Sequence, residues 1–165
     1  MRDRIVGGLD IDTYSDAPLR VSQTVFLDAP PRRVFAIISD SSHLRSWLPL
    51  VTQVNINRSH ADTRDGVGTI RYLHLGWFYT LREYVIAFDP PRLLASSIEQ
   101  DALIADHVSV ILLEPERYGG TNLTWQHYFR PGTLPFVTGP LLNAGLNLWT
   151  WLALRHLSAD LGGAS

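Results

Sequence analysis

The segment VGTIRYLHLGWFYTLREYVIAFD, residues 67–89, constrains the fold most, because two strand-like patterns flank Gly76-Trp77. Glycine at the first central position suits a two-residue type II′ turn, which fixes the register of an antiparallel hairpin. This turn predicts that Arg71 lies opposite Arg82, and that the pair faces solvent because buried like charges repel. The other face is then the inner one, and it carries Ile70, Tyr72, His74, Tyr79, Leu81, Glu83 and Val85.

A second segment with a clear strand pattern is TNLTWQHYFR, residues 121–130. Successive side chains of a strand alternate between its two faces. The pattern predicts one face of Asn122, Thr124, Gln126 and Tyr128 in water, and one inner face of Leu123, Trp125, His127 and Phe129. A histidine that points inward among aromatic side chains needs either a hydrogen-bonding partner or a function.

The order of the remaining patterns indicates the architecture. A strand at 20–28 precedes two short helices at 32–40 and 41–49; further strand patterns follow, and a long helix spans about 137–161. This order predicts an α+β fold, in which an antiparallel sheet of about six or seven strands wraps around the C-terminal helix. We expect an N-terminal extension at 1–19, one domain at 20–161 and a short tail at 162–165.

Composition narrows the classes of function. A chain of 165 residues that is 45% hydrophobic can bury one self-sufficient core. A net charge of −2 without long runs of one sign argues against a nucleic-acid partner or an anionic membrane surface. The chain has no cysteine, which excludes disulfides, thiolate metal sites and cysteine nucleophiles.

Two segments bear on localisation. The N-terminal sequence mixes charges and lacks the apolar core of a secretory signal, so we expect a cytoplasmic protein. Residues 140–157 are apolar but carry Asn143, Asn147 and Arg155, and they fall short of the roughly 20 apolar residues of a transmembrane span. We therefore expect a packed helix and no stable membrane insertion.

Familiar catalytic motifs are missing from the sequence. It contains no glycine-rich phosphate loop, dinucleotide fingerprint, nucleophile elbow or zinc-protease motif. The residues His74, His107, His127 and Glu83 come from different strands and lack the spacing of metal ligands. We expect neither a metal nor an organic cofactor.

Four stretches resemble a known superfamily: FLDAPPRRVFAIISDSSHLRSWLP, REYVIAFDPPRLL, DHVSVILLEP and GGTNLTWQHYFRP. Together they are similar to the START-like, Bet v 1-like proteins, also called SRPBCC or polyketide cyclase/dehydrase proteins, over residues 20–160. The resemblance implies a helix-grip fold with a hydrophobic cavity between the sheet and the long helix. It also implies that Glu83, His107 and Trp125 line this cavity, and that Asn147 and Leu154 look into it. The position of His107 is more usually a tyrosine in the superfamily.

The inner polar residues allow two interpretations. A buried Glu83 carboxylate has a raised pKa and can exchange protons near neutral pH, or it is paired with His107 or His127 and only stabilises the fold. His127 can act as an acid, a base or a donor to a ligand oxygen, or it is a packed histidine with a structural partner. The expected ligand-binding residues are Tyr72, His74, Tyr79, Leu81, Glu83, His107, Trp125, His127 and Asn147.

These observations leave three hypotheses of function. The first is a protein that holds a small hydrophobic molecule, such as a polyketide, isoprenoid or lipid-like compound, in an internal cavity. The second is a cyclase or dehydratase in which Glu83 and His127 act as acid and base. The third is a carrier or interaction module that uses an exposed helix face of Leu148, Trp149 and Leu152, with a second copy of the chain as a candidate partner.

Overall fold

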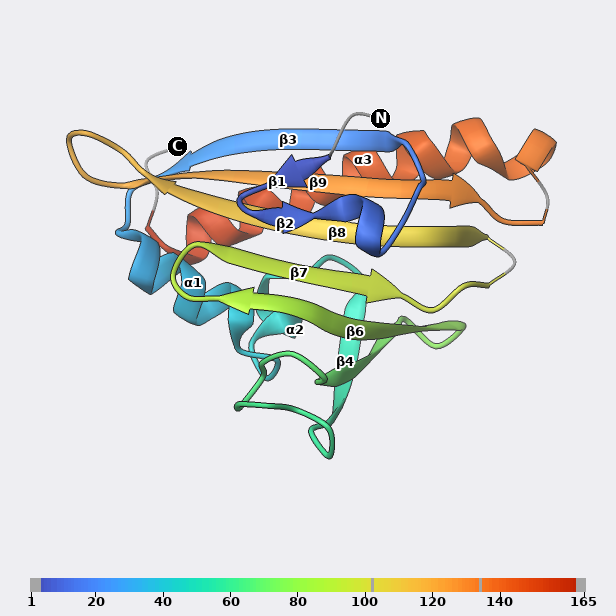
Figure 1. The fold of residues 1–165 in the computed structure, drawn as a ribbon, viewed down its shortest axis with the longest axis horizontal. Helices are drawn as coiled ribbons and strands as arrows, with labels where there is room; N and C mark the ends of the chain where they lie inside the picture. Colours follow the sequence, from blue (N-terminus) through green and yellow to red (C-terminus); the bar gives the residue numbers. More distant parts are fainter. Residues whose placement is uncertain (1–3, 102, 134, 163–165) are drawn as a thin grey trace.

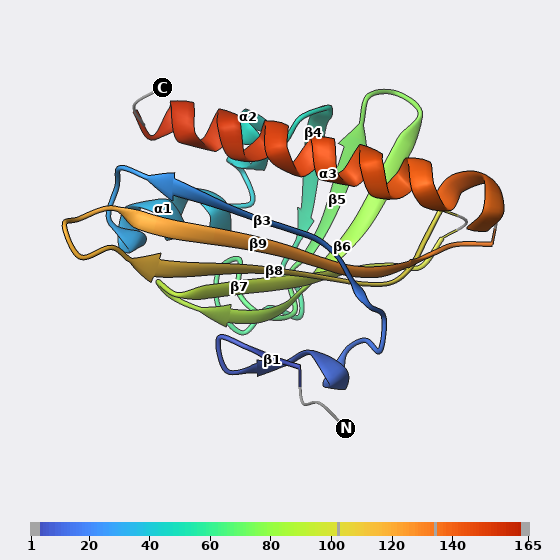
Figure 2. The same cartoon turned by 90° about the horizontal axis from the view of Figure 1, so that it is seen from above.

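A curved antiparallel sheet crossed by a long C-terminal helix forms the body of the protein in a computed structural model (Figures 1 and 2), which describes residues 4–101, 103–133 and 135–162. The sheet has seven strands in the order β3-β9-β8-β7-β6-β5-β4. Its strands are β3 (Leu19–Leu27), β4 (Val51–Asn57), β5 (Ile70–Leu75), β6 (Tyr79–Asp89), β7 (Leu93–Ile98), β8 (Ile104–Pro115) and β9 (Thr121–Pro131). The helices are α1 (Pro31–Ser39), α2 (Leu44–Trp47) and α3 (Pro135–Asp160). The predicted α+β helix-grip fold is confirmed.

The main core lies between the inner face of the sheet and the three helices. Figure 2 shows α3 running across one face of the sheet, with α1 and α2 beside its C-terminal half. That half of α3 contributes Ala153, Leu154 and Leu157 to the core, because these side chains recur on one face of the helix. Among the described residues, no helix has both the length and the apolar character needed to cross a membrane.

The N-terminal segment packs on the opposite face of the sheet, away from α3 (Figure 2). It contains the short strands β1 (Ile5–Val6) and β2 (Leu9–Asp10) and the 3-10 turn η1 (Ile11–Thr13). Ile11 is fully buried there against a second apolar cluster that includes Tyr128. The expectation that Tyr128 lies in water is therefore wrong, because the N-terminal segment covers the outer face of β9 at this point.

The hairpin of β5 and β6 differs from the predicted one by a shift of one residue. Leu75 pairs with Tyr79 across a three-residue loop, Gly76–Phe78, in place of the expected two-residue turn. Gly76 has φ +59°, which favours glycine, and its N–H donates to the Leu50 carbonyl at 3.0 Å. This hydrogen bond therefore anchors the loop to Leu50, in the connection between α2 and β4.

This register reverses part of the predicted inner face. Arg71 lies opposite Glu83, and Tyr72 lies opposite Arg82. Leu73 is buried and Leu81 packs against the same core, while Tyr72 and His74 are on the outer face. The predictions that Tyr72 and His74 point inward and that Arg71 faces solvent are wrong, because this register keeps the leucines out of water.

Candidate functional site

A chain of three buried polar side chains joins β8, β9 and α3 on the inner face of the sheet. His107 Nε2 lies 3.2 Å from His127 Nδ1, and His127 Nε2 lies 3.2 Å from Thr150 Oγ1. The Thr150 hydroxyl also donates to the Leu146 carbonyl at 2.8 Å. Both histidines are only 2% exposed, so this polar row (His107, His127 and Thr150) is shielded from bulk water.

A β-bulge lies next to His107 in β8. The register of β8 against β9 shifts between Ala105 and Val108, and Asp106 adopts φ +51°. The bulge is held from outside, because Ser15 donates to the Asp106 carbonyl at 2.7 Å and Arg130 donates to its carboxylate at 2.8 Å. His107 shares the inner face with Ser109 and Ile111 by strand alternation, and the bulge changes the register of the residues that precede it.

Three tryptophans fill the region beside the polar row. The ring of Trp125 is 5.6 Å from that of Trp47 and 5.7 Å from that of Trp149. Trp125 Nε1 donates to Ser109 Oγ at 2.6 Å, and Trp149 Nε1 donates to the Pro49 carbonyl at 2.8 Å. The predicted inward direction of Trp125 and His127 on β9 is confirmed by their burial, and their rings lie 5.0 Å apart.

Glu83 lies on the inner face as predicted, but its partners are not the histidines. Its carboxylate accepts from Arg71 Nη1 at 3.3 Å and from Ser96 Oγ at 2.6 Å. Arg71 also donates through Nε to Ser41 Oγ at 2.9 Å. Each carboxylate oxygen therefore has its own donor, and the Arg71–Glu83 pair is a buried ion pair.

Burial determines the protonation of the two histidines. Removal from water lowers the pKa of His107 to about 3. The same loss of solvation, together with the neighbouring His107, lowers the pKa of His127 well below its ordinary value. Both imidazoles are therefore neutral near pH 7, so they act as directed hydrogen-bonding groups rather than as charges.

The other expected site residues divide between the two faces of the sheet. Leu81 packs on the core, and the Tyr79 hydroxyl donates to Asp101. Tyr72 is on the outer face with the Arg82 guanidinium 5.7 Å from its ring centre. Asn147 is exposed and accepts from Gln23 at 2.5 Å at the edge strand, so the prediction that it looks into the interior is wrong. The burial of Leu154 agrees with the prediction for that residue.

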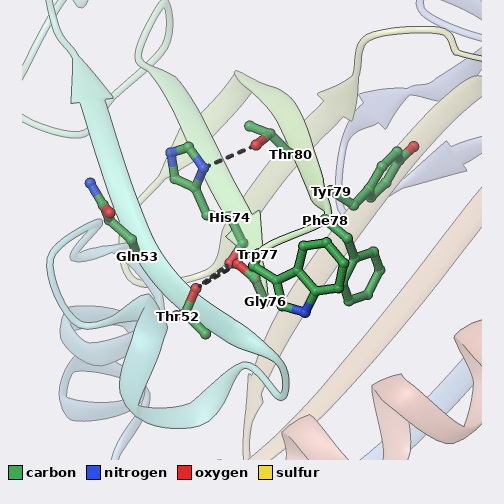
Figure 3. A pocket seen from close by; sticks show the side chains of 8 residues that line it. All are labelled: Thr52, Gln53, His74, Gly76, Trp77, Phe78, Tyr79 and Thr80. Atoms are coloured by element: carbon green, nitrogen blue, oxygen red, sulfur yellow. Dashed lines mark hydrogen bonds between the residues drawn. The ribbon is translucent and has the colours of Figure 1, made fainter.

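His74 contributes to a different feature, an open hollow of about 290 Å³ on the outer face of the hairpin (Figure 3). Asn55 Nδ2 donates to His74 Nε2 at 3.1 Å, and Thr80 Oγ1 lies 2.9 Å from His74 Nδ1. Trp77 and Phe78 also line this hollow. A second hollow of about 340 Å³ lies beside α1 at Pro90 and Pro91. Neither hollow lies between the sheet and α3, where the tryptophan side chains take up space.

Sequence reasoning missed Arg71, Ser96, Ser109 and Ser41 as members of the site. A signal for two of them was present, since Ser96 and Ser109 are small polar residues at inner-face positions of mostly apolar strands. Ser41 and Arg71 are far apart in sequence, so only the folded chain brings them together. Among the described residues, no group of three His, Asp or Glu side chains is arranged to hold a metal ion.

These features define a helix-grip domain with a polar row and an ion pair on the inner face of its sheet. A family model described as polyketide cyclase / dehydrase and lipid transport matches residues 18–153, and the chain belongs to this family. Membership supports a ligand-binding or cyclase role and leaves the ligand unnamed. No curated protein matches the chain significantly by sequence.

Several solved structures share the fold at low sequence identity. A protein of Nitrosospira multiformis is 18% identical with a TM-score of 0.69, covering 87% of this chain and 96% of its own. The di-domain ARO/CYC BexL from the BE-7585A biosynthetic pathway is 16% identical with a TM-score of 0.72, covering 87% of this chain and 50% of its own. The Aha1 dimer from Colwellia psychrerythraea is 14% identical with a TM-score of 0.63, covering 86% of this chain and 94% of its own.

Proposed function

We propose that the protein binds one small hydrophobic molecule between the sheet and α3, against Trp125 and the polar row. The observation that carries this proposal is a pair of unsatisfied polar atoms in the core. Among the described residues, Trp47 Nε1 and His107 Nδ1 are two of four buried side-chain polar atoms without a hydrogen-bonding partner. Buried polar groups are nearly always bonded in folded proteins, so these two atoms mark places where a ligand supplies the partner.

The walls of the region suggest the class of ligand. Trp47, Trp125 and Trp149 present large flat apolar surfaces, which pack well against ring-bearing molecules. The polar atoms around them are few and fixed in direction, as in typical small-molecule sites. A polyketide, isoprenoid or lipid-like compound fits this combination, and the family description names polyketide cyclases and lipid transport.

Binding requires a movement, because side chains occupy the region in the structure. The N-terminal half of α3 is the part best suited to move. Its Leu142 and Leu146 are only partly buried against Val21 and Phe129, and Gly145 has no neighbour within 4 Å of where a Cβ atom would stand. The C-terminal half is held by the main core. We expect the first half of α3 to lift from β3 and β9 when the ligand enters.

The geometry gives less support to the cyclase or dehydratase hypothesis with Glu83 and His127 as acid and base. Both oxygens of Glu83 accept hydrogen bonds, and both ring nitrogens of His127 have partners. In the described part of the chain, no hydrogen bond joins Glu83 to either histidine of the polar row. Both ring nitrogens of His127 are occupied, and Arg71 compensates the charge of the Glu83 carboxylate, so neither group is poised as a general base in this arrangement.

Native mass spectrometry of the purified protein tests the proposal, with 2-naphthol as an added probe for protein that carries no bound molecule. We expect a retained small molecule or a rise in melting temperature with 2-naphthol, because ligands that bind only the folded state stabilise it. The variant Trp125→Leu should lose this binding. Trp77→Ala is the matched control, since Trp77 is 95% exposed on the hairpin tip. Absence of any bound molecule and of any thermal shift would overturn the proposal.

A second candidate function, self-association, rests on the outer face of α3. Of the face expected from the sequence, Leu148 is exposed, but the prediction for Trp149 is wrong because its side chain packs against the main core. Leu141, Leu148 and Trp151 are exposed at spacings of seven and three residues, which places them on one side of the helix. The Arg155 guanidinium lies 4.7 Å from the Trp151 ring centre and extends the same face. An apolar stripe of this kind is typical of a contact between protein surfaces.

A further inference from the structure

The hydrogen atoms of the polar row can be assigned from its partners. Thr150 has a single hydroxyl hydrogen, and at 2.8 Å the Leu146 carbonyl, which can only accept, takes it. The Thr150 oxygen must then accept in its second contact. The donor in that contact is Nε2–H of His127 at 3.2 Å.

The hydrogen on His127 in turn determines the position of the hydrogen on His107. A neutral imidazole has one N–H, so Nδ1 of His127 has no hydrogen and accepts from Nε2–H of His107 at 3.2 Å. The remaining nitrogen of the row, Nδ1 of His107, then carries a bare lone pair. It is buried and lacks a partner among the residues that the structure describes.

The reverse order of hydrogens is less favourable. Thr150 would donate to His127, and His127 would donate to His107, so the bond to the Leu146 carbonyl would be lost. The row would then form two hydrogen bonds instead of three, and a buried N–H on His107 would have no acceptor. Burial keeps both rings neutral by lowering their pKa values, which removes the doubly protonated alternative.

We propose that Nδ1 of His107 accepts a hydrogen bond from a hydroxyl or N–H group of the bound molecule. This inference rests on the proposed function, because it assumes that the molecule binds between the sheet and α3. The lone pair attracts a donor and repels a carbonyl or ether oxygen placed at the same point. The site therefore selects hydrophobic molecules that present a hydroxyl or N–H donor at this position over hydrocarbons and ketones of the same shape.

Nitrogen-15 NMR of the free protein tests the assignment without any ligand. The resonance of an imidazole nitrogen without hydrogen lies well downfield of one with hydrogen, so we expect Nδ1 of His107 and Nδ1 of His127 downfield, and both Nε2 atoms upfield. Thr150→Ser should preserve this pattern because it keeps the hydroxyl. Thr150→Val removes the group that orients the row, and the tautomers should mix. A protonated Nδ1 on His107 in the unaltered protein would overturn the inference.

Ligand selectivity is tested with an isosteric pair, 2-naphthol and 2-methylnaphthalene, which differ by a hydroxyl in place of a methyl group. The affinity of each compound is measured by fluorescence titration for the unaltered protein and for His107→Phe. In the variant, we expect the affinity for 2-naphthol relative to that for 2-methylnaphthalene to fall by about tenfold. A change of this size corresponds to one net hydrogen bond. Thr150→Ser should keep the ratio of the unaltered protein.

The outcomes separate the two proposals. If both compounds bind and the ratio is the same with and without His107, the selectivity inference is overturned while the binding function stands. If neither compound binds the unaltered protein, both proposals fail for ring compounds of this class. If His107→Phe does not fold, the Thr150→Ser and Thr150→Val pair carries the same comparison, and equal ratios in these two variants would contradict the inference.

Discussion

Arg71 and Glu83 form an ion pair directly across β5 and β6, with side chains only 3% and 15% exposed. The pair is completed by Ser41 on the arginine side and by Ser96 on the glutamate side. A charge placed inside a protein is tolerated when its counter-charge and hydrogen bonds are all present. Each partner therefore depends on the other for its stability in the core.

We expect Glu83→Gln to destabilise the protein by about 3–5 kcal/mol, because it leaves the Arg71 charge buried without a counter-charge. Urea denaturation measures the change in the free energy of unfolding. Glu99→Gln is the matched control, since it breaks the exposed Arg82–Glu99 pair and should cost less than about 1 kcal/mol. Equal costs for the two variants would contradict the burial of the Arg71–Glu83 pair.

The neutral histidines predict a dependence of stability on pH. The pKa of His107 falls from 6.5 in the unfolded chain to about 3 in the folded one, so between these values the unfolded state binds a proton that the folded state does not. Stability is therefore fully present above about pH 6.5 and declines as the pH falls, by up to about 1.4 kcal/mol per pH unit for each such histidine.

Urea denaturation between about pH 4.5 and 6.5 checks this slope, because the pKa values of Asp12, Asp16 and Asp40 are lowered and these carboxylates lose their stabilising effect only at lower pH. His107→Phe should reduce the slope. His60→Gln should leave it unchanged, since His60 is exposed. A free energy of unfolding that is constant over this range would show that the histidines of the polar row are not held neutral.

The register of the β5–β6 hairpin is tested by a pair of adjacent positions. Leu73 is buried in the main core, so Leu73→Ala should cost about 2–5 kcal/mol. His74 is on the outer face, and His74→Ala should cost far less, since it removes only partly exposed hydrogen bonds to Asn55 and Thr80. Thermal or urea denaturation compares the two. A larger loss at His74 would support the register expected from a two-residue turn.

Self-association through the outer face of α3 is tested by sedimentation over a range of concentrations. Leu148 is 57% exposed on this face, and Leu148→Glu should shift the protein toward the monomer without loss of folding. Leu50→Glu provides a control, because Leu50 is also exposed but lies in the connection between α2 and β4. If the unaltered protein sediments as a monomer at every concentration, this candidate function is rejected.

Much of the fold follows from local patterns. The alternation of β9 places Trp125 and His127 on the inner face, and the chain folds this way because that face of the strand is apolar apart from His127. The order of strands and helices can also be predicted from the sequence, because apolar residues recur with different periods in strands and in helices. The inward direction of Glu83 was also predicted correctly, although through a hairpin register that was wrong by one residue.

The site itself depends on contacts between residues far apart in the sequence. No local pattern predicts that Ile11 covers Tyr128, that Arg71 meets Ser41, or that His107 on β8 contacts His127 on β9. The hairpin register was decided by the burial of Leu73 and by the anchoring of Gly76 to Leu50, not by the turn residues alone.

The sequence by itself determined which strand positions are apolar and therefore where the sheet, the helices and the inner face of β9 lie. Only the tertiary structure decided which polar groups meet inside, because hydrogen bonds and ion pairs act over a few ångströms and depend on positions set by the whole fold. The order of hydrogens along Thr150, His127 and His107 is of this second kind, since it begins at a backbone carbonyl of α3 and ends on β8.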